Sequence, residues 1–493
     1  MRATGGRGST GGCGVRLVAA ALGALMLAAC GTPGASLPPP GADEIAAWVT
    51  TADRQQLLQR QRVGPRFGRT AAGAQVIEVD DTRRYQVMAG FGASMTDASA
   101  WLIQQRMSAA QRQALMQELF GRGEQGLGMD LVRLTLGASD FSFTHYSYAD
   151  RPPGETDLPL AHFSIEPARR DVLPVVRQAL ELNPSLQVMA SPWSAPGWMK
   201  TSDSLIKGSL RPDMYDAFAR YLVAAVEAFA AEGVPLFALT VQNEPHFEPD
   251  DYPGMRVTPQ ARAEFVAHHL GPLLGRKGLP TRVIEWDHNW DDPDAALAVL
   301  GDPAARRWIS GVGWHCYVSD QLLPNQTRVR EAYPELDVWL TECSGGEWKP
   351  HWPETLPWLA RTLVIGATRH WARGVLMWNL ALDEQHGPHR GGCKDCRGVV
   401  TIDSRSGEVT RNMEYYAFAH ASRFVRRGAQ RIESSPGVDG VDSVAFRNAD
   451  DGSLVLVLAN SASSQRDIVV QHRGRAARHI LPRESVTTLQ WAP

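Results

Sequence analysis

Two glutamates, Glu244 and Glu342, each close a short apolar run and stand 98 residues apart in the chain. An apolar run with β character normally buries itself, and an ionised carboxylate at its end is costly unless it opens into a polar pocket. Two such ends that converge on one pocket place two carboxyl groups face to face. This arrangement suits glycoside hydrolysis, in which one carboxylic acid protonates the leaving oxygen and the other carboxylate attacks the anomeric carbon.

The elements that must position these glutamates are eight short apolar runs that alternate with amphipathic helix patterns. The helix patterns cover segments such as 108–120, 213–231 and 258–274, where apolar residues recur at helical spacing. We predict strands at residues 86–95, 131–137, 187–194, 236–244, 282–289, 309–317, 338–342 and 374–382.

Strand-helix alternation repeated eight times is typical of the (β/α)8 TIM barrel, whose active site lies at the carboxyl ends of the strands. We therefore predict an α/β fold with a barrel over residues 85–415. Both glutamates then lie at the end of the barrel that carries chemistry. An open doubly wound sheet is the alternative, although no glycine-rich phosphate motif follows the first predicted strand.

The two ends of the chain carry a different pattern. After residue 416, short runs at 444–446, 454–458, 467–470 and 485–489 lie between turn residues, as in antiparallel sheets. A small sheet needs a second layer, and segment 44–84 offers further β runs at 46–51 and 75–79. We predict an antiparallel β-sandwich domain built from both chain ends, over residues 44–84 and 416–493.

The first 29 residues carry three arginines and no acid, followed by an apolar stretch that is too short to span a bilayer. This pattern predicts an export signal. The sequence that ends in Cys30 resembles the lipobox of bacterial lipoproteins, which implies acylation of Cys30 and a flexible tether over residues 30–43. We expect an exported, lipid-anchored protein of the bacterial envelope, with an ordinary signal peptide as the alternative.

Removal of residues 1–29 moves the formal net charge from −3 to about −6. The rest of the chain has no cluster of arginines and lysines that could neutralise phosphates. The composition therefore argues against nucleic acid as a partner.

Beyond the export region the chain keeps four cysteines, which an oxidising compartment permits to form disulfides. For the pair Cys393 and Cys396 we favour a local disulfide that stiffens a loop. Free thiols, or a metal site completed by His386 and His389, are the alternatives. Cys316 and Cys343 follow adjacent predicted strands and could approach one another, but the sequence leaves open whether they bond.

Several segments in the order of the chain closely resemble glycoside hydrolase family 30, a clan A family, and especially its glucosylceramidase branch. They are residues 90–97, 190–200, 242–245, 378–382 and 420–428, and the resemblance extends from about Trp48 to the carboxyl terminus. The resemblance implies a TIM barrel with a β-sandwich, retention of configuration and a β-linked substrate. It implies no metal and no cofactor.

Carried over to this sequence, the resemblance makes Glu244 the acid/base and Glu342 the nucleophile. Asn243 resembles the donor to the sugar 2-hydroxyl, although a plain turn asparagine is the alternative. A retaining mechanism requires carboxyl groups about 5 to 5.5 Å apart, with no room for a water between them. The acid must hold its proton near neutral pH, whereas the nucleophile must stay ionised.

The resemblance also implies a set of residues around this pair. Arg133 resembles the arginine that keeps the nucleophile ionised, and Tyr317 could donate to Glu342. His315 matches a residue that lines the site, with a core histidine as the alternative. The expected sugar contacts are Asp140 and the tryptophans Trp193 and Trp378. The faces of the two tryptophans can cover the apolar side of a pyranose.

The expected activity is that of a β-glucosidase or glucosylceramidase acting on a β-linked glucoside, a glycolipid or an oligosaccharide. An endo-β-1,6-glucanase or a xylan-directed enzyme of the same family is the alternative. A carbohydrate-binding lipoprotein without turnover is a further alternative, which has no need of paired carboxylates. Membrane contact is expected only through the N-terminal lipid anchor.

Overall fold

The computed structural model describes residues 43–69, 75–123 and 125–493. The predicted export signal, Cys30 and the predicted tether up to residue 42 lie outside the described residues. Within the described part of the chain, no helix combines the length and the apolar character needed to cross a membrane.

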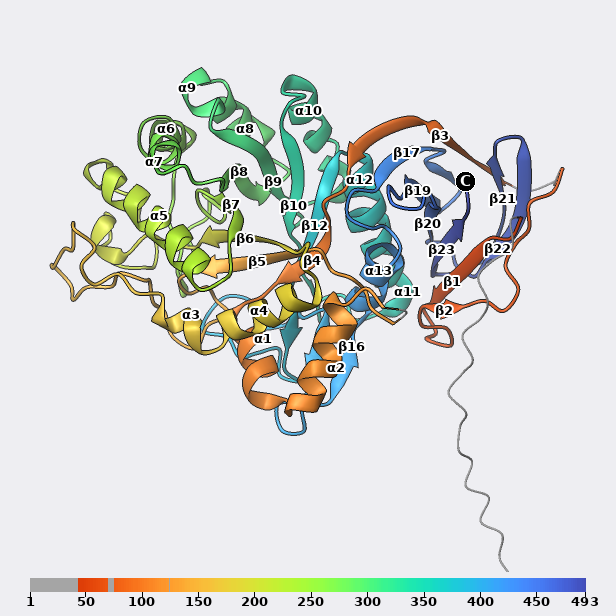
Figure 1. Ribbon diagram of the computed structural model, residues 1–493, viewed down its shortest axis with the longest axis horizontal. Helices are drawn as coiled ribbons and strands as arrows, with labels where there is room; N and C mark the ends of the chain where they lie inside the picture. The colour runs from red at the N-terminus through yellow and green to blue at the C-terminus, as the bar shows by residue number, and fades with distance from the viewer. Residues whose placement is uncertain (1–42, 70–74, 124) are drawn as a thin grey trace, which may run out of the picture. The chain divides into compact units, whose positions relative to one another are not determined.

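Eight parallel strands close into a barrel, which confirms the predicted fold class and excludes the open sheet (Figure 1). Around the barrel the strands follow one another in the order β10-β12-β4-β5-β6-β7-β8-β9. Their bounds are β4 Gly90–Ser94, β5 Leu131–Leu136, β6 Gln187–Pro192, β7 Leu236–Thr240, β8 Arg282–Asn289, β9 Ile309–His315, β10 Asp337–Glu342 and β12 Ala372–Asn379.

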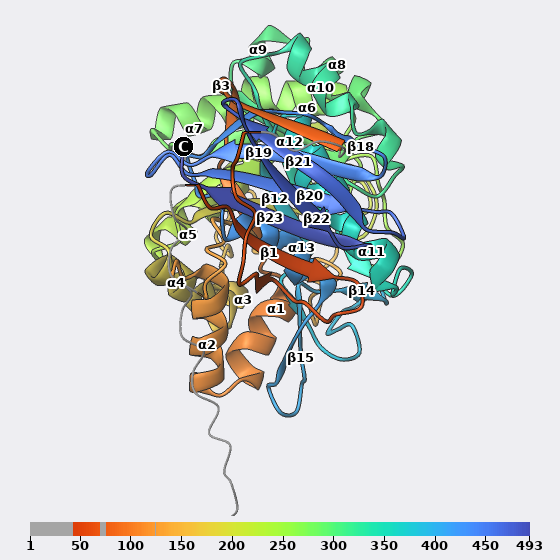
Figure 2. The same cartoon turned by 90° about the vertical axis from the view of Figure 1, so that its right-hand side faces the viewer.

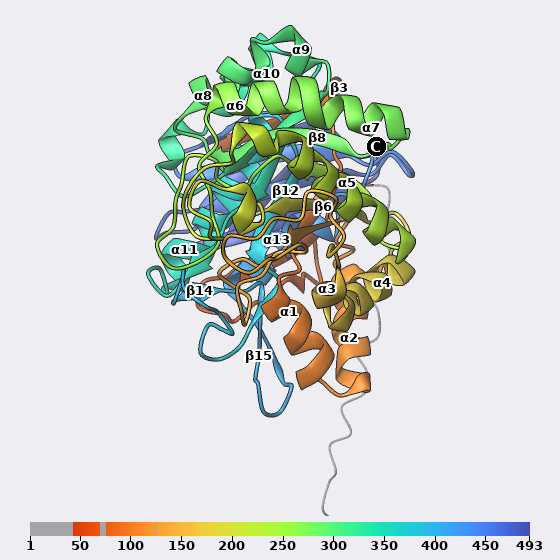
Figure 3. The same ribbon diagram turned by 90° about the vertical axis from the view of Figure 1, so that its left-hand side faces the viewer.

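Helices cover the outside of the barrel (Figures 1 and 3). The predicted helix at 108–120 forms α2, which begins with a capping box between Ser108 and Gln111. The described helices are α1 Asp97–Trp101, α2 Ala109–Phe120, α3 Glu166–Arg170, α4 Val172–Leu182, α5 Tyr215–Ala231, α6 Pro259–Glu264, α7 Gly271–Lys277, α8 Pro293–Leu300, α9 Pro303–Arg306, α10 Asn325–Ala332, α11 Trp352–Leu359, α12 Ala367–Arg369 and α13 Met413–Ser422.

The strands are buried on both faces, as expected for a parallel sheet covered by helices. All six residues of β5 are buried. Near the amino ends of the strands, one apolar cluster of Ala89, Leu131, Met189, Ala238, Ile284, Trp339 and Leu376 fills the barrel interior. This layer closes the bottom of the barrel and leaves the upper layer for polar side chains.

The second domain is a sheet of ten strands in the described residues, and both chain ends contribute to it (Figure 2). The main path is β2-β1-β23-β20-β19-β17-β3-β21-β22, and β18 pairs with β19. The bounds are β1 Ala46–Thr51, β2 Gln59–Arg60, β3 Gln75–Val87, β17 Gln430–Ser434, β18 Gly437–Val438, β19 Val441–Arg447, β20 Leu454–Asn460, β21 Arg466–His472, β22 Arg475–Leu481 and β23 Ser485–Trp491.

Strand β3 lies between β17 and β21, so the predicted sandwich from both chain ends is confirmed, although β3 pairs with β21 in parallel and not antiparallel as predicted. Strand β20 is buried along its whole length. Leu456 and its neighbours on one face join the sandwich core, whereas Val455 and Val457 on the other face join the core of the barrel. The sandwich is thereby packed against the barrel.

Five short strands shape the loops above the barrel. β11 Gly345–Gly346 pairs with β14 Cys396–Arg397. β13 Ala381–Leu382, β15 Val400–Ile402 and β16 Val409–Arg411 form a small sheet of their own.

The fourth barrel strand is shorter than predicted. It ends at Thr240, so the prediction of a strand that runs to Glu244 is wrong. Glu244 lies four residues further on, with a φ of 46° in the left-handed region. The backbone N–H groups of Asn243 and Glu244 donate to the carbonyls of Pro192 in β6 and Asp287 in β8, at 2.9 and 3.0 Å, so this turn stays bound to both neighbouring strands beyond the regular ladder.

The position of β3 predicts that the N-terminal segment stabilises the sandwich. Ile77 is 1% exposed in the sandwich core, whereas Val76 next to it is 37% exposed. Ile77→Ala should lower the free energy of unfolding by about 2 to 5 kcal/mol because it leaves a cavity. The matched control Val76→Ala should change it by less than about 0.5 kcal/mol. Equal effects of the two variants in urea unfolding would contradict this role of β3.

Candidate active site

A layer of polar side chains lies directly above the apolar layer of the barrel. Moving two residues along a strand keeps a side chain on the same face. Leu131, Met189, Ala238, Trp339 and Leu376 of the apolar layer are followed in this way by a second set of inward residues. These are Arg133, Ser191, Thr240, Thr341 and Trp378.

Strand β8 breaks this alternation. Ile284 is followed two residues later by Trp286, but the register with β9 shifts between Trp286 and His288. Trp286 and Asp287 have φ values of 73° and 59°. Such an irregularity re-aims side chains near active sites, and here it brings Asp287 into the polar layer.

Asp287 is fully buried and lies within hydrogen-bond distance of five polar groups. Its Oδ2 is 2.9 Å from Arg133 Nη2, and its Oδ1 is 3.0 Å from His315 Nε2. The hydroxyls of Ser191, Thr240 and Thr341 lie 2.8, 2.7 and 2.6 Å away. Burial alone would raise the pKa of Asp287, but Arg133, His315 and Thr341 outweigh burial and hold the pKa well below its usual range.

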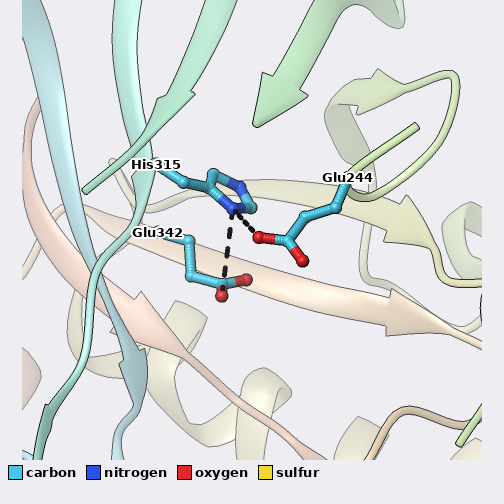
Figure 4. A group of neighbouring side chains, drawn as sticks. All are labelled: Glu244, His315 and Glu342. Carbon is cyan, nitrogen blue, oxygen red and sulfur yellow. Dashed lines mark hydrogen bonds and ion pairs between the residues drawn. The ribbon is translucent and has the colours of Figure 1, made fainter. Parts of the chain in front are cut away.

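The carboxyl groups of Glu244 and Glu342 lie near each other beside the His315 ring, as Figure 4 shows, and both residues line one pocket. One carboxylate oxygen of Glu244, one of Glu342 and a ring nitrogen of His315 all lie within 4.8 Å of one another. This separation is in the range of the retaining mechanism and leaves no room for a water between the carboxyl groups.

Glu342 is held by two donors. Arg133 Nη1 donates to Glu342 Oε2 at 2.6 Å, and the Tyr317 hydroxyl donates to Oε1 at 2.8 Å. The same guanidinium donates from Nη2 to Asn243 Oδ1 at 2.8 Å. Because arginine only donates, the oxygen of the Asn243 amide must face it, and the amide NH2 group remains as a donor.

His315 links Glu244 to Asp287. Its Nδ1 is 3.0 Å from Glu244 Oε1, and its Nε2 faces Asp287. Burial disfavours a charged imidazole, but the charge of Glu342 and the bonds to Asp287 and Glu244 raise the pKa of His315 to about 9. The ring therefore carries two N–H groups at neutral pH and donates one to Glu244 and the other to Asp287.

The two carboxyl groups differ in their surroundings. Burial raises the pKa of Glu342 in spite of the nearby cations His315 and Arg133. For Glu244, burial is outweighed by the hydrogen bond from His315 and by the charges of His288 and His315, which lower its pKa. In the free site the proton nearest Glu244 is therefore the one on His315 Nδ1.

The pocket has a volume of about 610 Å³, and its lining includes most of the predicted sugar contacts. Trp193 and Trp378 stack on each other at 5.0 Å with an interplanar angle of 21°. Asp140 is buried, and burial together with the charge of Glu342 raises its pKa to about 8. A protonated Asp140 can donate a hydrogen bond to a sugar hydroxyl as well as accept one.

The loop between β13 and β14 closes one side of the pocket. Cys393 and Cys396 form the local disulfide that the sequence favoured over free thiols and a metal site, with a Cα–Cα distance of 5.7 Å. Gly392 has a φ of 62°, and a Cβ there would lie 2.4 Å from the Asp140 Cβ. Only glycine lets the loop approach the pocket this closely.

A second disulfide joins Cys316 and Cys343, with a Cα–Cα distance of 5.3 Å. It connects the ends of β9 and β10, and the sequence had left this bond open.

The structure thus brings together all the predicted site residues that it describes: Arg133, Asp140, Trp193, Asn243, Glu244, His315, Tyr317, Glu342 and Trp378. The sequence prediction left out Asp287, although it lies at the end of a predicted strand, because an acid there can equally be structural. It also left out Trp348, which lines the pocket together with Phe247, Asp251 and Tyr252.

Comparisons with known proteins agree with this geometry. Residues 88–425 match the glycosyl hydrolase family 30 TIM-barrel domain, and residues 428–489 match the glycosyl hydrolase family 30 beta sandwich domain. An endo-1,6-beta-D-glucanase of Neurospora crassa is 32% identical over 84% of this chain and 87% of the relative. The lysosomal acid glucosylceramidase of Mus musculus is 28% identical over 80% of this chain and 79% of the relative.

Among solved structures, an endo-beta1,6-glucanase has a TM-score of 0.83 and 31% identity, covering 91% of this chain and 99% of that chain. The comparisons do not confirm the predicted glucosylceramidase-like branch, because the glucanases named here share more sequence with this chain than the glucosylceramidase does. With both domains matched and two carboxyl groups facing each other in the barrel, the chain belongs to glycosyl hydrolase family 30 and is a retaining β-glycoside hydrolase.

Proposed function

We propose that the chain hydrolyses β-1,6-linked glucan, with Glu342 as nucleophile and Glu244 as acid/base. Arg133 and Tyr317 orient the Glu342 carboxylate toward the anomeric carbon and disperse its charge. As the bond to the leaving oxygen breaks, Glu244 delivers a proton, and in the second step it takes one from the attacking water. The amide of Asn243 is positioned to donate to the sugar 2-hydroxyl.

The observation that carries the choice of substrate is the rim of the pocket. Phe247, Tyr317 and Trp348 line the pocket and are 45%, 42% and 49% exposed. Aromatic faces of this kind stack on the apolar side of a sugar ring. Asp250 and Asp251 lie beside them and can accept from sugar hydroxyls.

This rim fits a neutral sugar better than the acyl chains of a glycolipid. Hydrocarbon chains would take the carboxylates of Asp250 and Asp251 out of water, and the contacts with Lys207 and with the Gly392 N–H would have to offset this cost alone. The 1,6 linkage is supported by the endo-1,6-glucanases among the relatives. Glucosylceramide is the competing substrate, because glucosylceramidases also share this fold.

The N-terminal pattern supports anchoring in the bacterial envelope through Cys30. Two disulfides among the described residues suit an oxidising compartment outside the cytosol.

The purified enzyme should release oligosaccharides from β-1,6-glucan at least tenfold faster, as kcat/KM, than it releases glucose from glucosylceramide. The control Glu342→Gln should lose turnover on both substrates while still binding sugar, because the amide cannot act as the nucleophile. Trp348→Ala should raise KM for gentio-oligosaccharides more than for an aryl β-glucoside, which tests the rim. Preference for glucosylceramide by the wild-type enzyme would overturn the choice of substrate.

The pKa shifts predict a bell-shaped profile of kcat/KM against pH. The nucleophile must be ionised, and the raised pKa of Glu342 places the acidic limb above the ordinary glutamate range. The acid must have a proton available, and the His315 and Glu244 pair loses its proton as the pH rises through about 9. Initial rates measured from pH 4 to pH 10 on wild-type enzyme check both limbs. A profile that is still flat down to pH 4 would contradict the assignment of Glu342.

Asp287→Asn should lower kcat about 100-fold, because its charge holds both Arg133 and His315 in place. Loss of that charge also lowers the pKa of His315, so the basic limb of the profile should move to lower pH. Asp97→Asn is the matched control, because Asp97 is a half-buried acid that accepts a hydrogen bond from Tyr146 outside the polar layer. If the Asp287→Asn variant keeps the basic limb of the wild-type pH profile, Asp287 serves only the stability of the fold.

A further inference from the structure

The disulfide between Cys316 and Cys343 is placed among the residues that carry the reaction. Cys316 stands between His315 and Tyr317, and Cys343 directly follows Glu342. The bond joins the carboxyl ends of the neighbouring strands β9 and β10. It therefore connects the segment that holds Glu342 to the segment that holds its hydroxyl donor.

We propose that the Cys316–Cys343 disulfide is a positioning element of the glycosidase reaction. It holds the Tyr317 hydroxyl at hydrogen-bond distance from Glu342 and so sets the orientation and the ionisation of the nucleophile. This proposal rests on the role of Glu342 in the proposed function, but not on the identity of the aglycone.

The backbone alone gives Tyr317 little support. The pairing of β10 with β9 ends at Glu342 and His315, after a shift of register between Leu340 and Glu342. Tyr317 lies beyond the last paired residue of β9 and is 42% exposed. Its backbone N–H donates to the Asn289 side chain at 3.0 Å, and its hydroxyl donates to Glu342 at 2.8 Å.

The disulfide supplies a constraint at the point where the strand ladder stops. Cys343 is fully buried and Cys316 is 6% exposed, and both belong to the main apolar core. The Cys343 carbonyl also accepts from the backbone N–H of Trp378 at 2.8 Å. Three consecutive strand ends, which carry Tyr317, Glu342 and Trp378, are thus tied to one buried point.

The other disulfide constrains a shorter part of the chain. Cys393 and Cys396 are three residues apart, so their bond constrains one loop, whereas 27 residues separate Cys316 from Cys343. Between the two disulfides of the described residues, the Cys316–Cys343 bond is the one that ties two barrel strands together.

Several charged or titratable groups surround Glu342, and the hydroxyl of Tyr317 acts in addition to them. Its hydrogen bond lowers the pKa of Glu342, which burial raises. The other groups that interact with this carboxylate are Arg133 from β5, Asp140 after β5, Glu244 and Tyr252 after β7, and His315 from β9. If Tyr317 is displaced, these groups stay in place. Loss of the Tyr317 hydrogen bond therefore raises the pKa of Glu342.

A double-mutant cycle tests the proposal with an aryl β-glucoside, or with whichever β-glucoside the wild-type enzyme turns over. Removal of the disulfide in C316A/C343A should lower kcat by about 10- to 100-fold and change KM less than about threefold, because small displacements of reacting groups cost this much. The acidic limb of the pH profile should move to higher pH. In the Tyr317→Phe background the same removal should lower kcat less than about twofold, because the hydroxyl that it positions is already absent.

Two results would overturn the proposal. One is a C316A/C343A variant with unchanged kcat and only a lower melting temperature. The other is an equal loss of kcat in the presence and absence of the Tyr317 hydroxyl. If the variant does not fold, the C393A/C396A variant is used instead, and its remaining Cys316–Cys343 disulfide is reduced and then reoxidised. Thiol counting verifies the reduction. Activity that survives the reduction overturns the proposal. If the wild-type enzyme is inactive on β-1,6-glucan, the proposed substrate is refuted. The double-mutant cycle can still be measured with the β-glucoside that the enzyme cleaves.

Discussion

One buried carboxylate, Asp287, organises the upper layer of the barrel. Partners from β5, β6, β7, β9 and β10 approach its two oxygens within 3.0 Å. A carboxylate taken out of water must be matched by donors or it destabilises the fold. Two of these donors, Arg133 and His315, also hold the reacting groups Glu342 and Glu244. The requirement to satisfy one buried charge therefore fixes the geometry of the whole site.

The charges of this layer nearly balance. Arg133 and a protonated His315 oppose Asp287, Glu244 and Glu342, which leaves one net negative charge among these five side chains. A proton that moves from His315 Nδ1 to Glu244 Oε1, across 3.0 Å, does not change this balance. The acid of the reaction can thus be ionised in the free enzyme and still have its proton at hand, which reconciles its lowered pKa with its role.

Much of this arrangement could be predicted from sequence because it follows from periodicity. Each of the eight predicted barrel strands overlaps a barrel strand of the structure, and their alternation with helices placed Glu342 at a strand end. The prediction failed where the backbone leaves its regular geometry. Strand alternation predicts that the Trp286 side chain points into the barrel. Because Trp286 and Asp287 have left-handed backbone conformations, the Asp287 side chain enters the polar layer instead. Glu244 reaches the pocket from a turn beyond β7, which an apolar run cannot reveal.

Strand β3 sits in the interior of the sandwich sheet, between β17 and β21, although it precedes the whole barrel in the chain. Along the chain, the catalytic barrel therefore lies between the two segments that together form the sandwich domain. A gene fragment that begins at residue 88 would omit β3 and leave β17 and β21 without the strand that pairs with both of them. The two domains cannot be exchanged as independent cassettes, so recombination between relatives has to replace them as a unit.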